Sequence, residues 1–230
     1  MAAKSFYLGM IGLSPKPTNF STADTPSPSL LTLLKNGSLI PSLSYAYTAG
    51  QHYATSTGQL ASLTLGGYDA SRFIPSSAAI FPFASDDTYP LTIGLQAITV
   101  SRTLNGGTVQ LLDQGGIFTV IDSTVPEIWL PNSTCDRLAV ALGLTYDTRT
   151  DRHIVNATTH ASLSSLKPVF EFSLGVDRVG VSSTSIALPY AALDLNASYN
   201  IFNTSTSYFP IRRSANEKQY TLGRTFLQEA

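Results

Sequence analysis

Residues 117–131 read Ile117-Phe118-Thr119-Val120-Ile121-Asp122-Ser123-Thr124-Val125-Pro126-Glu127-Ile128-Trp129-Leu130-Pro131, and this stretch decides the fold. Its β-branched and aromatic residues up to Ile121 predict a strand that leads directly into Asp122. A strand interior disfavours an unpaired carboxylate, because removing the charge from water is costly. We therefore expect Asp122 at a strand end, either capping a turn or serving a site that needs a carboxylate. Ser123 can anchor that turn through its hydroxyl.

Three other segments have a recognisable pattern. Near the C-terminus, Tyr220-Thr221-Leu222-Gly223-Arg224-Thr225-Phe226-Leu227 is a short strand that ends on glycine. Upstream, Tyr7-Leu8-Gly9-Met10-Ile11-Gly12-Leu13 predicts a strand that runs into a glycine turn. Between them, Gly58-Gln59-Leu60-Ala61-Ser62-Leu63-Thr64-Leu65-Gly66-Gly67-Tyr68-Asp69 predicts a strand that ends in a Gly-Gly turn.

The order of these segments resembles a pepsin-like aspartic peptidase of fungal type. In that family an Asp-Ser/Thr motif at a strand end lies on a loop beneath a second strand that ends on glycine. The resemblance implies an all-β, bilobal fold with a few short helices. It divides the chain into a remnant of the N-terminal lobe with the inter-lobe strand, residues 1–74, and a C-terminal lobe, residues 75–230, that carries Asp122.

The resemblance also implies roles for the residues of the motif. Asp122 matches one of two catalytic carboxylates, which share a proton and hold the water that attacks the peptide bond. Ser123 matches a hydroxyl residue that braces the loops of the two lobes. Thr124 stands where the family usually has glycine, and Val125 stands where a hydroxyl residue often contacts the carboxylate. These two differences from the family motif leave the catalytic Asp in place, but they argue against ordinary peptidase activity.

The second carboxylate of the dyad has no counterpart in this sequence. The family's first motif and its flap would lie upstream of Met1, and the chain stops where the family's last strand would begin. We therefore expect a truncated chain that is inactive or nearly so by itself. Five other acids lack the required strand-turn context: Asp24, Asp69, Asp86, Asp87 and Asp113.

Two functional hypotheses follow from this half-dyad. In the first, the chain is the C-terminal part of an endopeptidase that binds a peptide or protein substrate in extended conformation and needs its missing N-terminal half. In the second, it is a pseudoenzyme or peptide-binding module with the peptidase fold. A homodimer that pairs two copies of Asp122 is disfavoured, because the N-terminal remnant would obstruct the pairing.

Composition narrows the class of protein. Charged residues make up 13% of the chain, the net charge is −1 and the pI is near 6.3, so there is no electrostatic basis for binding nucleic acid or an anionic membrane. Ser, Thr, Gly and Pro take the place of charged residues, which is typical of many short strands joined by turns. We expect no metal or cofactor: His52 lies in a polar loop, and His153 and His160 alone do not make a metal site.

Glycosylation acceptors give the best indication of compartment. Six acceptors in a chain of low charge favour a secreted or cell-surface glycoprotein. The N-terminus has no signal-peptide pattern, and no segment approaches a transmembrane span, so this assignment applies to the full-length form. The acceptors are Asn19, Asn36, Asn132, Asn156, Asn196 and Asn203.

Cys135 is the only cysteine in the chain. The resemblance implies disulfides in the second lobe, so a lone thiol departs from the family. Its partner lies outside this chain, which we prefer, or it is an inert buried thiol. A catalytic thiol is disfavoured because no nearby histidine supplies the usual base.

The remaining patterns predict local elements. The leucines after Ser29 predict a helix that ends at Asn36-Gly37 with a left-handed cap, and Asn105-Gly106-Gly107 predicts a hairpin turn. After Pro131, Asn132 or Ser133 can cap a helix that Gly143 ends.

Overall fold

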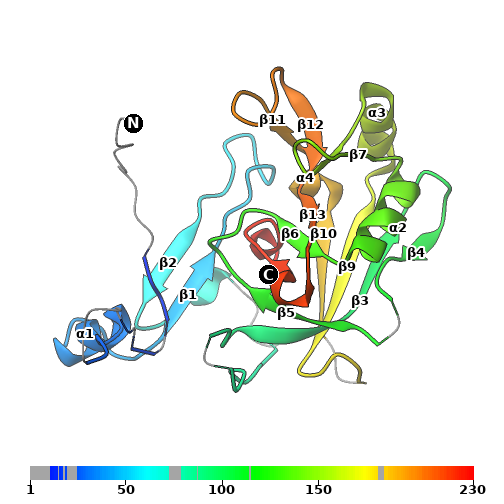
Figure 1. Cartoon of the computed structure of the whole chain (residues 1–230). Coiled ribbons are helices and arrows are strands. Elements are labelled where there is room, and N and C mark those ends of the chain that lie inside the picture. The colour runs from blue at the N-terminus through cyan, green and yellow to red at the C-terminus, as the bar shows by residue number, and fades with distance from the viewer. Residues whose placement is uncertain are drawn as a thin grey trace, which may run out of the picture. The chain divides into compact units, whose positions relative to one another are not determined.

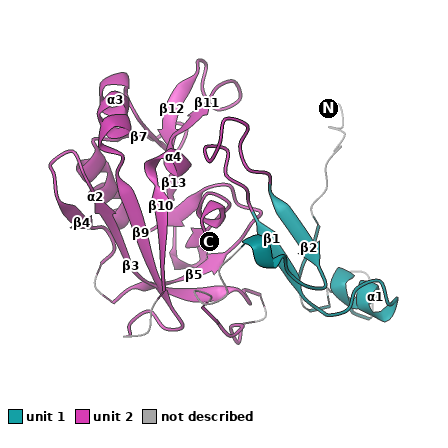
Figure 2. Ribbon diagram, turned by 180° about the vertical axis from the view of Figure 1, so that it is seen from behind, with its two compact units in different colours: residues 1–48, 61–78 teal, residues 49–60, 79–230 magenta. Residues whose placement is uncertain are grey.

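The computed structural model describes residues 11–14, 16–17, 19, 25–72, 79–86, 88–113, 115–180 and 184–230. They form two compact units, coloured separately in Figure 2. Unit 1 comprises residues 1–48 and 61–78, and unit 2 comprises residues 49–60 and 79–230. The loop at residues 49–60 thus packs with the C-terminal unit. The lobe boundary expected between residues 74 and 75 stays a prediction, and Tyr7–Met10 lie outside the described residues.

Unit 1 is built around a short helix and a hairpin-like pair of strands. The helix α1 (Leu30–Asn36) begins where the sequence predicts, because Oγ of Ser29 accepts the N–H of Thr32 at 3.2 Å. It also ends where predicted, but the positive φ of 57° falls on Ser38, while Gly37 has a φ of −78°. The other elements of unit 1 are β1 (Tyr45–Thr48), β2 (Ser62–Leu65), antiparallel to β1, and η1 (Ala70–Arg72).

Unit 2 contains two β-sheets (Figure 1). In the eight-stranded sheet the order is β10-β9-β3-β5-β14-β6-β13, and β4 pairs with β3; in the four-stranded sheet the order is β11-β12-β8-β7. The first sheet consists of β3 (Thr92–Ser101), β4 (Thr108–Gln110), β5 (Ile117–Ile121), β6 (Ile128–Leu130), β9 (Val169–Gly175), β10 (Thr184–Pro189), β13 (Ile211–Arg213) and β14 (Thr221–Leu222). The second consists of β7 (Thr145–Asp147), β8 (Arg152–Ile154), β11 (Leu195–Ala197) and β12 (Thr206–Phe209).

The core of unit 2 packs against the eight-stranded sheet. Along a strand of this sheet, alternate side chains point into the core. In β9, Phe170 and Phe172 are fully buried while Glu171 between them is exposed, as the period of two in a strand requires. Each aromatic ring buried in this way stabilises the fold by about 1.5–3 kcal/mol. The expected all-β architecture with a few short helices is therefore present.

Helices cover part of this core. The helix α2 (Asn132–Leu142) lies beside β3, β4 and β9 in both views and ends at Gly143, whose φ is 64° (Figures 1 and 2). Pro131 precedes it without a side-chain cap, so the predicted capping by Asn132 or Ser133 is wrong. The other helical segments are α3 (Ala157–Leu166), α4 (Tyr190–Leu193), η3 (Glu217–Gln219) and η4 (Phe226–Gln228).

Candidate active site

The strand β5 carries the chain to Asp122 as the sequence predicts. The short strand β14 lies between β5, to which it is parallel, and β6, to which it is antiparallel. The N–H of Asp122 donates to the carbonyl of Leu222 in β14 at 3.2 Å, and the N–H of Val125 donates back to the carbonyl of Asp122 at 3.3 Å. Asp122 therefore occupies the start of a tight turn at the strand end.

The segment after Asp122 wraps around Gly223. A Cβ on Gly223 would lie 2.3 Å from the carbonyl oxygen of Glu127 and 2.4 Å from that of Val125, so only glycine allows this approach. The N–H of Arg224 donates to the carbonyl of Val125 at 2.8 Å, and the N–H of Thr225 donates to that of Pro126 at 3.1 Å. We call residues 122–127 the Asp122 loop.

One carboxylate oxygen of Asp122 is fixed by a neighbouring residue. Oδ1 accepts the N–H of Thr124 at 2.8 Å and its hydroxyl at 2.7 Å. Ser123 is exposed, and its hydroxyl makes no hydrogen bond to the described residues; only its carbonyl is bound, by Nη1 of Arg224 at 2.9 Å. The prediction that Ser123 anchors the turn is therefore wrong, and Thr124 takes this part. The inter-lobe role of Ser123 and the role of Val125 stay predictions.

The described part of the chain offers no second carboxylate bonded to Asp122. Asp113 pairs with Arg137, and Asp69 accepts the N–H and hydroxyl of Ser71 in a turn of unit 1. Asp86 accepts the N–H of Thr88 at 2.8 Å. Asp24 and Asp87 lie outside the described residues.

A cavity of about 720 Å³ lies in unit 2 beside the strand that leads to Asp122. Phe118 and Val120 of β5 line it together with Phe83, Tyr89 and Tyr220, and polar residues, among them Asp177, Glu217 and Lys218, complete the wall. Asp122 itself is not part of the lining. The cavity therefore offers both aromatic and polar surface beside β5, without direct contact with the carboxylate of Asp122.

Comparison with known proteins assigns the family. A model of the eukaryotic aspartyl protease family matches residues 2–230. The chain belongs to this family. The crystal structure of the aspartic proteinase from Irpex lacteus is similar at a TM-score of 0.58 and 16% sequence identity, which confirms the pepsin-like fold. The match covers 89% of this chain and 56% of that one, so the chain spans just over half its length. No curated protein sequence matches the chain.

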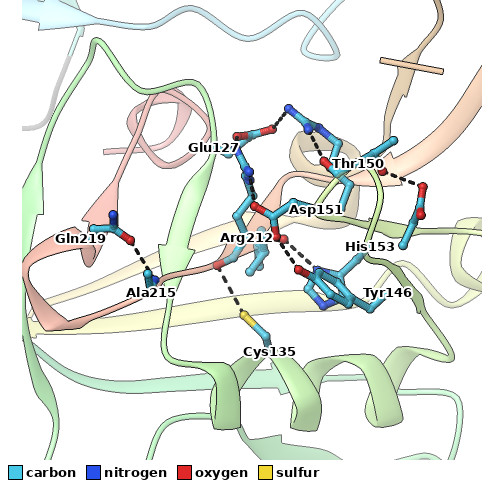
Figure 3. Close-up of polar contacts among 12 residues, drawn as sticks. Glu127, Cys135, Tyr146, Thr150, Asp151, His153, Arg212, Ala215 and Gln219 are labelled. Carbon is cyan, nitrogen blue, oxygen red and sulfur yellow. Dashed lines mark hydrogen bonds and ion pairs between the residues drawn. The ribbon is translucent and has the colours of Figure 1, made fainter.

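The lone cysteine of this aspartyl protease chain is a buried thiol. Cys135 on α2 is fully buried, and its Sγ lies 3.5 Å from the carbonyl oxygen of Arg212, as Figure 3 shows. Burial raises the pKa of the Cys135 thiol to about 12, which keeps it protonated and unreactive. This environment fits the alternative of an inert buried thiol, whereas a disulfide partner outside the chain stays a prediction.

Each of the three histidines has a hydrogen-bond partner, which their positions in polar segments of the sequence do not predict. His153 is fully buried, with Nδ1 2.9 Å from the carbonyl oxygen of Ile211, and burial lowers its pKa. His160 faces both oxygens of Asp194 at 3.0 Å, and Nδ1 of His52 lies 3.3 Å from Oε1 of Gln228. Within the described residues, no group of three His, Cys, Asp or Glu side chains could hold a metal ion.

All six glycosylation candidates are exposed. Asn156 has a second role that sequence reasoning missed, because its Oδ1 accepts the N–H of Thr159 at 2.8 Å and caps α3. In the part of the chain that the structure describes, no helix is long and apolar enough to cross a membrane.

Proposed function

We propose that the chain is the C-terminal part of a secreted pepsin-like aspartic endopeptidase, in which Asp122 supplies one of two catalytic carboxylates. The observation that carries this proposal is the position of Asp122 at the end of β5, on a loop that wraps Gly223. Thr124 holds Oδ1, while Oδ2 has no hydrogen-bond partner among the described residues. That oxygen is free for a water or a substrate.

The chemistry needs a second carboxylate. Two carboxyl groups that share one proton hold a water between them, because two like charges in contact do not both ionise easily. The ionised carboxylate takes a proton from the water as the water attacks the peptide carbonyl, and the protonated one donates a hydrogen bond to the carbonyl oxygen. In this proposal the second carboxylate belongs to the missing N-terminal half, so the chain alone is inactive or nearly so.

The substrate in this proposal is a peptide bound in extended conformation. The cavity beside β5, where Phe83, Tyr89 and Phe118 lie among polar residues, supports binding of peptide side chains on this strand. Six exposed acceptor asparagines support passage through the secretory pathway. A mobility shift after glycosidase treatment of secreted full-length protein would test that passage.

Complementation tests the catalytic proposal. The chain is mixed or coexpressed with an N-terminal half from the same family and incubated with a peptide library between about pH 3 and pH 6. We expect pepstatin-sensitive cleavage by the complemented pair, no cleavage by the chain alone, and loss of cleavage in D122N. A folded, complemented pair that cleaves no peptide would contradict the proposal.

The second candidate is a peptide-binding module without catalysis. Thr124 and Val125 favour it, because both depart from the motif that the family's peptidases usually carry. Peptide binding that persists in D122N, together with no cleavage after complementation, would support this function. Sedimentation of a monomer across a wide concentration range would argue against the disfavoured homodimer of two Asp122 sites.

A further inference from the structure

A buried carboxylate just beyond the Asp122 motif connects the two sheets of unit 2. Glu127 is only 4% exposed; its Oε1 lies 2.8 Å from Nη2 of Arg152 and its Oε2 lies 3.4 Å from Nη1 of Arg212. Arg152 belongs to β8 of the four-stranded sheet, whereas Arg212 belongs to β13 of the eight-stranded sheet. Asp151 forms a further ion pair with Arg212, and Figure 3 shows Glu127, Asp151 and Arg212 side by side.

Arg212 also contacts an aromatic ring in its own sheet. Its guanidinium carbon lies 4.4 Å from the centroid of Trp129, and the two residues are register partners in the parallel pair of β13 and β6. A guanidinium on an indole face is a favourable cation–π contact. Trp129 is the only tryptophan in the chain. Its fluorescence therefore reports on the position of the Arg212 guanidinium over the indole ring.

The backbone of Glu127 links this cluster to the candidate active site. Its carbonyl lies against Gly223, and the preceding carbonyls of Val125 and Pro126 accept the N–H groups after Gly223. The backbone around Gly223, just after β14, thus holds the Asp122 loop along its length. The side chain of Glu127 holds the far end of the loop. Removing one partner of a buried ion pair leaves the other charge uncompensated, which would loosen this end of the loop.

We propose that Glu127 and Arg212 are positioning residues for Asp122. Their ion pair fixes the far end of the Asp122 loop, and through it the direction in which Asp122 presents its carboxylate. Glu127 itself is buried and contacts no substrate. The catalytic consequence rests on the proposed function of Asp122, whereas the restraint on the loop is measurable without any cleavage.

Amide hydrogen exchange of the 230-residue chain tests the restraint. The N–H groups of Asp122, Arg224 and Thr225 close the Asp122 loop, and we expect E127Q to speed their exchange by about tenfold or more. The amide of Leu111, which donates to the carbonyl of Ile98 at 2.8 Å beyond the end of β4, should keep its rate. The matched control is E171Q, which removes the same charge from an exposed position of β9 and should change none of these amides.

R212K provides a second variant should E127Q fail to fold. Lysine keeps the positive charge but loses the planar stacking on Trp129, so we expect a changed tryptophan emission and a smaller rise in exchange at the same three amides. The proposal is overturned if the three amides exchange as in E171Q. It is equally overturned if every amide, including that of Leu111, speeds up alike, because the cluster would then stabilise the whole unit and not the loop.

A catalytic readout separates this proposal from the function itself. In the complemented pair, E127Q should lower kcat and leave KM unchanged, since the buried Glu127 does not contact the peptide. An equal kcat in E127Q and the parent pair would overturn the positioning role. If no pair cleaves at all, the proposed function fails, while the exchange measurement still decides whether Glu127 restrains the loop.

Discussion

At the scale of single residues, the carboxylate of Asp122 is held from one side only. Thr124 directs both its backbone N–H and its hydroxyl to Oδ1, so the orientation of the carboxylate depends on one neighbour. Hydrogen bonds donated to an ionised group are among the stronger ones in proteins. The bulk that Thr124 adds where the family usually has glycine is therefore accompanied by a specific contact.

Replacing this hydroxyl should weaken the turn. We expect T124V to lower the free energy of unfolding of unit 2 by about 0.5–1 kcal/mol, and T124S to restore it, because serine keeps the hydroxyl. Urea unfolding followed by Trp129 fluorescence measures both. The control is T119V in β5, where the hydroxyl is buried with no hydrogen-bond partner among the described residues, so its loss should be neutral or stabilising. Equal effects of T124V and T119V would contradict this role of Thr124.

At the scale of elements, β14 organises the site although it has only two residues. It lies between β5 and β6, and the chain continues into Gly223 where two carbonyls approach. The close approach allows the Asp122 loop to wrap the strand from both sides. A short strand is stable here because both of its edges are paired.

Adding one methyl group at Gly223 should break this arrangement. Since a Cβ would meet two backbone carbonyls that cannot move independently, we expect G223A to cost more than about 4 kcal/mol or to prevent folding. Soluble yield and urea midpoint measure the effect. G180A is the control in the same unit, since its Cβ would make only an ordinary 3.5 Å contact with Gln96. A G223A protein as stable as G180A would show that the loop tolerates a wider path.

Some of these elements can be predicted from local sequence patterns, and others cannot. The strand before Asp122, the α1 helix after Ser29 and the end of α2 at Gly143 were predicted, because each carries a strong local signal. The helix α3 was missed because only Leu163 among its residues is buried, so it has no apolar periodicity. Its one usable signal is Asn156, which caps the helix and also stands in an acceptor pattern for glycosylation.

At the scale of the whole molecule, the sequence predicts one part of the candidate site and not the other. The motif order led to Asp122 and Gly223, which the structure brings together. The ion cluster of Glu127 and Arg212 was not predictable, because its members are 85 positions apart in the chain and meet only through sheet order. The same holds for the burial of Cys135, which depends on where α2 lies against the sheet.

This cluster should also make unit 2 sensitive to acid. Burial alone would raise the pKa of the Asp151 carboxyl, but hydrogen bonds from Tyr146 and Arg212 outweigh it and leave the pKa lowered. A carboxyl with a lowered folded pKa stabilises the fold above its unfolded value, which is about 3.9, and this stabilisation is lost as the pH falls through the folded pKa.

The lowered pKa of Asp151 predicts how the stability of D151N depends on pH. Near about pH 6 the variant should be less stable than the parent chain by about 0.5–1 kcal/mol, because the pair is partly exposed to solvent. The difference should shrink toward zero below about pH 3, where the parent loses its own pairing. Urea midpoints measured across this range test it, with D177N as the control at an exposed aspartate. Parallel curves for D151N and the parent would mean that Asp151 stabilises the fold by packing and not by its charge.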